Sequence, residues 1–229
     1  MPKILHNLQT IGSEIAQSCE AANRQSEDVQ LLAVSKRHSA DAIREAYAAG
    51  QRAFGENYVQ EMLEKSQQLA ELDIEWHFIG PLQSNKTKDV AMTASWVHTV
   101  DRLKIARRLS EQRPADLPPL NICLQVNVNQ EASKSGVALD AVNELVETVD
   151  QLPNLKLRGL MAIPESTTDV NKQRANFALL ANAQAALNSS AYTLDTLSMG
   201  MSGDMDAAIA EGATIVRIGT AIFGNRPTA

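Results

Sequence analysis

Short apolar runs alternate with segments of helical periodicity along the whole chain of 229 residues. The runs have the length and composition of buried strands. Eight of them are expected as strands: Gln30–Ser35, Arg52–Gly55, Ile74–Gly80, Trp96–Val100, Asn121–Val128, Lys156–Ile163, Thr193–Met199 and Ile215–Gly219. Helices are expected near residues 39–49, 56–72, 84–94, 102–112, 137–151, 169–188 and 203–211. This alternation is typical of β-α units whose strands pair in parallel.

Eight such units are the number that closes into a barrel. An open, doubly wound sheet is the alternative, but no G-x-G-x-x-G motif follows the first apolar run. The chain length is normal for one barrel domain. We therefore expect an α/β fold: a single TIM-type (β/α)8 barrel over residues 1–229, with no second domain. An extra N-terminal helix is expected, because apolar residues recur at helical spacing at Ile4, Leu8, Ile11 and Ile15.

Composition argues against several classes of partner. A net charge of −6 and an aromatic content of 4% do not suggest nucleic acid or a membrane surface. No apolar stretch has the length of a signal peptide or of a membrane span, so a cytoplasmic protein is expected. Cys19 and Cys123 form no C-x-x-C pair and are expected to be reduced thiols. The four histidines form no metal-binding pair, so no metal site is expected.

The first strand run is followed almost at once by a lysine, Lys36. In barrels of this type the functional groups lie at the C-terminal ends of the strands. A lysine at that position is either a solvated turn residue or an amine that forms a Schiff base with a carbonyl compound. The second run ends in FGEN, which places Asn57 at the same rim.

Small residues follow the last two strand runs. Ser198, Gly200, Ser202 and Gly203 precede a helix expected at about residue 203, and Gly219 and Thr220 follow the eighth run. Loops at these two places commonly bind phosphate in such barrels, because backbone N–H groups at a helix N-terminus attract an anion. Both stretches can also be read as plain tight turns.

Arg217 lies inside the apolar sequence IVRIG. A buried guanidinium needs a partner, either a carboxylate in the core or an acceptor atom of a ligand. A lysine, a phosphate cradle and an inward arginine together suggest pyridoxal 5′-phosphate (PLP), whose aldehyde, phosphate and ring nitrogen match the three features. Arginine on the ring nitrogen disfavours a pyridinium, which weakens the case for demanding carbanion chemistry.

Seven stretches of the chain carry a resemblance to a known family. They are LLAVSK at 31–36, FGENYVQE at 54–61, EWHFIGPLQSNK at 75–86, HTVDR at 98–102, VN at 127–128 with SKSG at 133–136, RGLMAIP at 158–164, and LSMGMSGDMDAAIAEGATIVRIGTAIFG at 197–224. With them the chain resembles the pyridoxal phosphate homeostasis protein family, close to its bacterial members, over nearly its whole length. None of the stretches alone is specific; together they are.

The resemblance implies a barrel like the N-terminal domain of bacterial alanine racemase, with PLP held as a Schiff base on Lys36. It further implies cofactor-binding roles for a set of residues: phosphate contacts from Ser198, Ser202, Gly219 and Thr220, Arg217 on the ring nitrogen, and Asn57 and Met161 beside the cofactor. No catalytic residue is assigned. The family looks like a manager of free and bound PLP that affects vitamin B6 and amino-acid balance.

The chain departs from the family pattern at two positions. Arg37 stands where a small hydroxyl residue usually follows the lysine, and Gly203 stands where many relatives carry an acidic residue. Arg37 adds a positive charge at the rim of the site, and Gly203 removes a negative charge beside the phosphate cradle. Both changes leave the expected function intact and put the affinity for PLP in doubt.

Three functions are compatible with these residues. The first is a carrier that binds PLP reversibly and buffers it or delivers it to PLP-dependent apo-enzymes, as a monomer. The second is a PLP-dependent amino-acid racemase, which needs a second base opposite the lysine. In the related racemases this base is a tyrosine from a second domain, and none of Tyr47, Tyr58 and Tyr192 ends a strand run. The third is a Schiff-base aldolase without a cofactor. We rank the carrier first.

Overall fold

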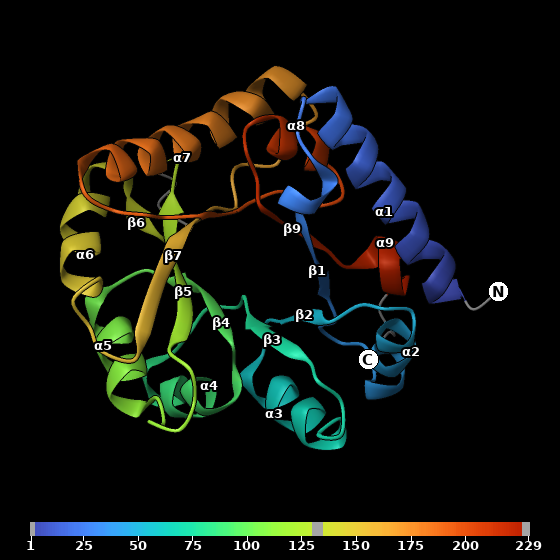
Figure 1. Cartoon of the computed structure of the whole chain (residues 1–229), viewed down its shortest axis with the longest axis horizontal. Helices are drawn as coiled ribbons and strands as arrows, with labels where there is room; N and C mark the ends of the chain where they lie inside the picture. The colour runs from blue at the N-terminus through green and yellow to red at the C-terminus, as the bar shows by residue number, and fades with distance from the viewer. Residues whose placement is uncertain (1–2, 130–134, 226–229) are drawn as a thin grey trace.

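Eight parallel strands form a closed ring in the computed structural model of the protein, which describes residues 3–129 and 135–225 (Figure 1). Around the ring the strands follow the order β4-β3-β2-β1-β9-β8-β7-β5, and the pairing of β4 with β5 closes it. The strands are β1 Gln30–Val34, β2 Ala53–Glu56, β3 Glu75–Phe78, β4 Trp96–Val100, β5 Leu120–Asn127, β7 Leu155–Met161, β8 Thr196–Ser198 and β9 Ile215–Ile218. The predicted TIM-type barrel is confirmed.

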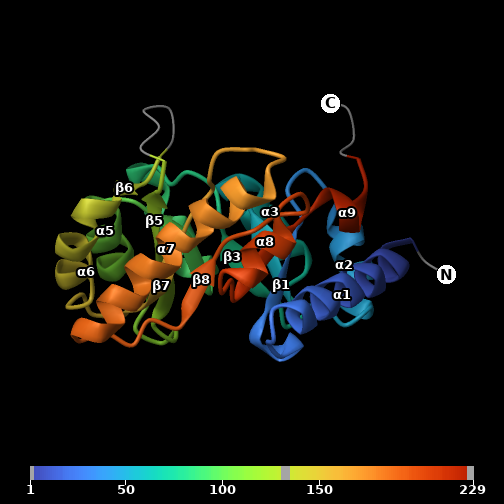
Figure 2. The ribbon, with the colours of Figure 1, turned by 90° about the horizontal axis from the view of Figure 1, so that it is seen from above.

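Helices surround the ring and connect successive strands (Figures 1 and 2). They are α1 Lys3–Ala21, α2 Ala40–Ala48, α3 Val59–Gln68, α4 Thr87–Thr93, α5 Leu103–Gln112, α6 Val142–Val149, α7 Val170–Ser190, α8 Met205–Ala210 and α9 Thr220–Phe223, with short 3-10 turns η1 Ser26–Asp28, η2 Ser84–Lys86 and η3 Leu139–Ala141. Among the described helices, none is long and apolar enough to cross a membrane. The predicted N-terminal helix is α1, which buries Ile4, Ile11, Ile15 and Cys19.

Among the predicted helices that begin later than their periodicity suggested, two do so for a reason that the hydrogen bonds show. The segment from residue 137 starts as a two-residue strand, β6 (Val137–Ala138), because Val137 pairs with Val126 of β5. Helix α8 begins at Met205 rather than at residue 203, because Asp204 closes a turn on Met201. Local main-chain and side-chain hydrogen bonds thus compete with helix formation at both places.

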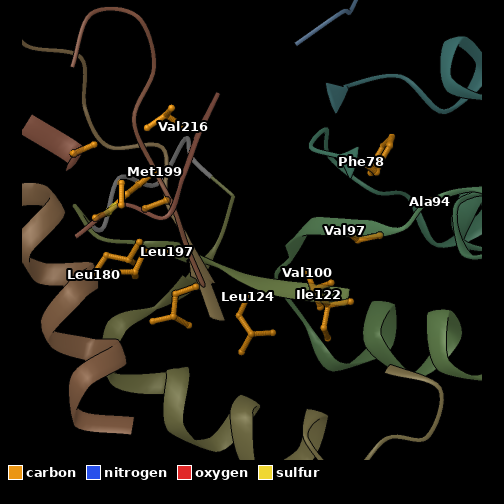
Figure 3. Packing of buried hydrophobic residues seen from close by; sticks show 14 of the residues in the cluster. Phe78, Ala94, Val97, Val100, Ile122, Leu124, Leu180, Leu197, Met199 and Val216 are labelled. Atoms are coloured by element: carbon orange, nitrogen blue, oxygen red, sulfur yellow. The ribbon is translucent and has the colours of Figure 1, made fainter. Parts of the chain in front are cut away.

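The outer core fills the space between the ring of strands and the helices. Side chains alternate between the two faces of a strand, so every second residue points outward to the helices. Figure 3 shows part of this layer. Its labelled members are fully or almost fully buried: Phe78, Ala94, Val97, Val100, Ile122, Leu124, Leu180, Leu197, Met199 and Val216. Burial of this apolar layer holds the helices against the barrel.

The inside of the ring is filled by a second set of side chains. Two small apolar clusters lie there, one formed by Leu32, Val34, Ala53, Ile79 and Ile215 and the other by Trp96, Cys123 and Met161. Between them runs a line of polar side chains, which is described below. Both cysteines are buried and unpaired thiols, as expected, and burial raises the pKa of Cys123 to about 12.

The contact between β7 and β8 leaves no room for a side chain at Gly159. A β-carbon there would lie 1.8 Å from the carbonyl oxygen of Thr196 on the next strand. We therefore expect Gly159→Ala to lower the free energy of unfolding by at least about 3 kcal/mol, because backbone must move. Gly12 is the matched control: it is exposed on α1 with nothing within 4 Å of the added atom.

Gly12→Ala should raise stability by roughly 0.5–1 kcal/mol, since alanine favours helix. Urea unfolding followed by circular dichroism measures both changes. Equal effects of the two substitutions would contradict the close contact between β7 and β8.

Candidate functional site

The eight residues predicted to hold a ligand lie in, or shortly after, five strands that neighbour one another in the ring, β7-β8-β9-β1-β2. Because all strands are parallel, their C-terminal ends meet at one rim of the barrel. Met161 ends β7, Ser198 ends β8, Arg217 lies in β9, and Asn57 directly follows β2. The remaining four are in the loops just after β1, β8 and β9: Lys36, Ser202, Gly219 and Thr220.

Lys36 is half-buried two residues beyond the end of β1, and the residues on both sides of it are held in place. The buried ammonium of Lys65 on α3 donates to the carbonyl oxygen of Ser35 over 2.9 Å. The backbone N–H of Arg37 donates to the Glu61 carboxylate over 2.7 Å. Arg37 has a φ of 63°, a left-handed conformation that is unfavourable for its side chain. External contacts thus fix the backbone from which the Lys36 side chain starts.

Glu56, Glu61 and Lys65 form the cluster that supplies these contacts, which we call the clamp. Lys65 lies 2.7 Å from Glu56 and 3.0 Å from Glu61. The hydroxyl of Ser35 donates to the same Glu56 oxygen over 2.7 Å. Burial raises the pKa of Glu56 against the effect of the lysine, and its second carboxyl oxygen has no partner among the described residues.

Gly219 brings the loop after β9 against β1. A β-carbon at Gly219 would lie 3.1 Å from the carbonyl oxygen of Val34 and 3.4 Å from its β-carbon. The parallel pairing of β1 with β9 therefore places the predicted anion-binding residues Gly219 and Thr220 next to the strand end that leads to Lys36. Thr220 is exposed and is the first residue of α9.

The loop after β8 is tight and already partly hydrogen-bonded. Gly200 has a φ of 95°, and a β-carbon there would lie 2.6 Å from that of Ala208 on α8. Arg217 donates its backbone N–H to the carbonyl of Gly200 over 3.0 Å. The carboxylate of Asp204 accepts from the backbone N–H of Met201 over 2.6 Å, and burial raises the pKa of Asp204. Ser202 is exposed at the tip of this loop.

Arg217 points into the barrel, where it is buried. Its Nη1 donates to the carbonyl oxygen of Ser198 over 2.6 Å and to the Ser198 hydroxyl over 2.9 Å. Its Nη2 donates to the carbonyl oxygen of Ala162 over 2.9 Å. Of the two partners predicted for this guanidinium, a core carboxylate is not found within ion-pair distance among residues 3–129 and 135–225. Burial lowers the pKa of Arg217 to about 10, so it stays protonated at neutral pH.

Asn57 faces a cavity of about 320 Å³ at the same rim. Its amide oxygen is buried and accepts no hydrogen bond within the described part of the chain. A buried acceptor without a partner is unfavourable unless a ligand supplies the donor. The other walls come from the ends of β3, β4 and β5 and from the loops near them: Ile79, Pro81, Thr99, Gln125, Val126, Asn127, Ser135 and Ile163. Met161 is fully buried against Trp96 and Cys123, beneath this region.

A chain of polar side chains crosses the barrel below Arg217. His98 on β4 lies 2.7 Å from the Ser198 hydroxyl, His77 on β3 lies 2.9 Å from His98, and Glu75 lies 2.6 Å from His77. Burial lowers the pKa of His77, and it lowers the pKa of His98 well below the usual value, so both rings are neutral. With both ring nitrogens hydrogen-bonded and no exposed surface, His77 is a satisfied core histidine.

Sequence reasoning missed the clamp and the polar chain. A signal for the clamp was present: Glu56 ends an apolar strand run, and Glu61 and Lys65 are four residues apart on one helix face. The polar chain joins residues up to 142 positions apart (Glu75 and Arg217), so no local pattern announces it. Among the residues that the structure describes, no group of three or more metal-binding side chains is found. Residues 133 and 134 of the SKSG stretch lie outside the described residues.

The sequence matches the profile of the family described as "Alanine racemase, N-terminal domain" over residues 7–227. Curated relatives include the pyridoxal phosphate homeostasis protein of Pseudomonas aeruginosa, 59% identical over 226 residues, which are 99% of this chain and 97% of the relative. The protein of the same name from Escherichia coli is 52% identical over 229 residues, 99% of this chain and 98% of the relative.

Solved structures show the same relationship. PipY of Synechococcus elongatus with PLP bound superposes with a TM-score of 0.84 and is 39% identical, covering 96% of this chain and 100% of PipY. An alanine racemase from Clostridium difficile has a TM-score of 0.73 at 16% identity, covering 100% of this chain and 58% of the racemase. The second likeness is one of fold alone.

The clamp generates a prediction about stability. Lys65→Met leaves the buried Glu56 carboxylate without its cation, which should cost about 3–5 kcal/mol of unfolding free energy at pH 8. Without the lysine, the pKa of Glu56 in the folded state rises further above its unfolded value. The loss should therefore shrink as the pH falls and Glu56 becomes protonated.

Arg44→Met is the control, because it breaks the exposed pair of Arg44 with Glu71 and should cost no more than about 1 kcal/mol. Denaturant unfolding at pH 8 and pH 5 separates the two cases. A loss in Lys65→Met that is independent of pH would show that Glu56 is not the unpaired group.

Proposed function

Because the chain belongs to the pyridoxal phosphate homeostasis protein family, we propose that it binds PLP as a Schiff base on Lys36. We propose further that it carries and buffers PLP, and so maintains vitamin B6 and amino-acid homeostasis. The observation that supports this most is the arc of five neighbouring strand ends, which presents a lysine, small-residue loops and an inward arginine to one space. PipY, which is solved with PLP, shares the fold at 39% identity.

The residues of the arc fit the parts of the cofactor. The loops at Ser202 and at Gly219–Thr220 offer hydroxyl and backbone N–H donors to a phosphate, and Ser198 lies at the start of the first loop. Two Arg217 hydrogens, one on Nε and one on Nη2, are given no acceptor by the described residues and suit the ring nitrogen. The unpartnered oxygen of Asn57 suits a donor beside the ring. Met161 provides an apolar floor.

When bound, the cofactor supplies an aldehyde that bonds reversibly to an amine and a ring that can accept electrons. The residues of this protein determine how the bound cofactor is held and how strongly its ring accepts electrons. The clamp holds the Lys36 backbone, so that the amine starts from one position. Arg217, protonated at neutral pH, donates to the ring nitrogen rather than accepting from it, which keeps the ring a weak electron acceptor.

A carrier fits the chain better than a racemase does. Tyr47 packs against Arg52 on the outer helix layer, and Tyr192 follows α7. Tyr58 follows Asn57 but is exposed, with Arg37 near its ring. None of the three tyrosines is a buried base facing Lys36. PLP-dependent apo-enzymes are the proposed recipients, with a monomeric carrier in the cytoplasm.

Reduction of the PLP-treated protein with borohydride tests the attachment, because it converts a Schiff base into a stable secondary amine. Mass spectrometry should find the phosphopyridoxyl group on the peptide that contains Lys36. Lys36→Ala should lose the label, whereas Lys86→Ala, which removes an exposed lysine of η2, should retain it. Labelling that persists in Lys36→Ala would overturn the proposal and favour a cofactor-free role such as an aldolase.

The same preparation distinguishes carrier from enzyme. We expect no racemisation of any amino acid above the rate with free PLP, because none of the three tyrosines is a buried base facing Lys36. Circular dichroism of the amino acid after incubation measures this. Racemisation well above the free-cofactor rate that disappears in Tyr58→Phe would make the protein an enzyme with Tyr58 as its second base.

A further inference from the structure

The polar chain inside the barrel is continuous from the rim to the opposite end. It runs from Arg217 through the hydroxyl of Ser198 to His98, His77 and finally Glu75, with each link between 2.6 and 2.9 Å. Strands β4 and β8 are not neighbours in the ring, so the bond between His98 and Ser198 crosses the interior. Glu75 is the first residue of β3, at the end of the barrel away from the rim, and its side chain is 40% exposed.

Arg217 and Glu75, the two ends of the polar chain, differ in the hydrogen bonds that they can make. A guanidinium only donates hydrogen bonds, and an ionised carboxylate only accepts them. The hydrogen bond from His77 lowers the pKa of Glu75, so the carboxylate is ionised at neutral pH. Each group between Arg217 and Glu75 must therefore accept a hydrogen bond from its neighbour on the Arg217 side and donate one to its neighbour on the Glu75 side. The Ser198 hydroxyl donates to Nδ1 of His98, Nε2–H of His98 donates to Nδ1 of His77, and Nε2–H of His77 donates to Glu75.

Reversing the donors and acceptors along the polar chain is unfavourable. With Glu75 ionised, it requires a second proton on one of the two histidines. Both rings are fully buried, and burial disfavours the imidazolium form. The indole ring of Trp96 stacks on His77 at 5.5 Å and shields one face of that ring from water. Two further groups support the ionised carboxylate: the neutral amide of Gln30 donates to Glu75 over 3.2 Å, and the positive charge of Arg158 lowers its pKa.

We infer that Glu75, His77 and His98 are positioning residues that orient Arg217 toward the ligand through the Ser198 hydroxyl, an inference that rests on the proposed PLP function. Because the Ser198 proton is committed to His98, the Ser198 oxygen presents its lone pairs to Nη1 of Arg217. Both hydrogens of Nη1 are then used on Ser198, and one hydrogen of Nη2 is used on Ala162. The hydrogens left over on Nε and Nη2 are then the ones available to a ligand. The Glu75 carboxylate, at the end of the barrel away from the rim, thus determines which N–H groups of Arg217 are available at the rim.

The direction of the chain can be measured without any cofactor. Nitrogen NMR of the cofactor-free protein, labelled with ¹⁵N at its four histidines, reports which ring nitrogen carries the proton. We expect both His77 and His98 to be protonated on Nε2 only. In Glu75→Gln the amide can donate as well as accept, so a second tautomer should appear at His98 as well as at His77. Glu71→Gln, which removes an exposed carboxylate of the surface pair with Arg44, should change neither ring.

The tautomer of His98, which does not contact Glu75, distinguishes a positioning role of Glu75 from an effect on local packing around His77. A change confined to His77, the direct neighbour of Glu75, or a wild-type His98 protonated on Nδ1, would overturn the one-way chain. His98→Gln is a second variant, because an amide also carries one acceptor and one donor, whereas His98→Leu carries neither. The glutamine variant should retain the Nε2 tautomer of His77 and the leucine variant should lose it.

The effect on the ligand is read from the absorption spectrum of the PLP-treated protein. Glu75→Gln and His98→Leu should shift the pH midpoint of the Lys36 Schiff-base band, and Glu71→Gln should not. An unshifted midpoint in both chain variants, with labelling of Lys36 intact, would refute the link to Arg217. Absence of the band in the wild type, with the NMR result as expected, would instead refute the proposed PLP function.

Discussion

Closure of a parallel sheet is the constraint on which the rest of this molecule depends. The pairing of β9 with β1 and of β4 with β5 removes every open edge in the ring, and it forces all strand ends to one rim. Residues that are distant in sequence, such as Leu32 and Arg217, become neighbours for this reason. Gly159 and Gly219 show how closely the backbones must approach for closure, since neither position has room for a β-carbon without movement.

The same closure gives the barrel an interior that is not simply apolar. Two small apolar clusters flank a polar chain whose members are all hydrogen-bonded. Buried polar groups of this kind are costly unless every one has a partner, and when satisfied they specify one arrangement. The clamp at Glu56 and Lys65 is a second buried polar network, outside the ring, in which one oxygen of Glu56 is left without a partner among the described residues. Both networks end on residues that we propose contact PLP, one on the backbone around Lys36 and one on Arg217.

Periodicity was sufficient to predict the barrel, because each strand and helix buries a face whose spacing is visible locally. It placed the strand ends, and therefore the rim residues, within a few positions. It did not predict β6 or the late start of α8, since these depend on a pairing with Val126 and on the turn closed by Asp204. Glu75 and His77 share one strand face, but nothing local says that His98 and Ser198 complete their chain. Contacts that cross the barrel depend on which strands face each other, and the sequence pattern does not contain that information.

The most direct test of this account is a crystal structure of the protein after soaking with PLP. The account predicts continuous density from Lys36 to the cofactor, phosphate against the loops at Ser202 and Gly219, and a ring nitrogen within hydrogen-bond distance of Nε or Nη2 of Arg217. The contacts of Arg217 with Ser198 and of Ser198 with His98 should be unchanged. Density for PLP elsewhere, or a ring nitrogen that faces away from Arg217, would contradict the central claim that the arc of strand ends and the chain beneath it are built for this cofactor.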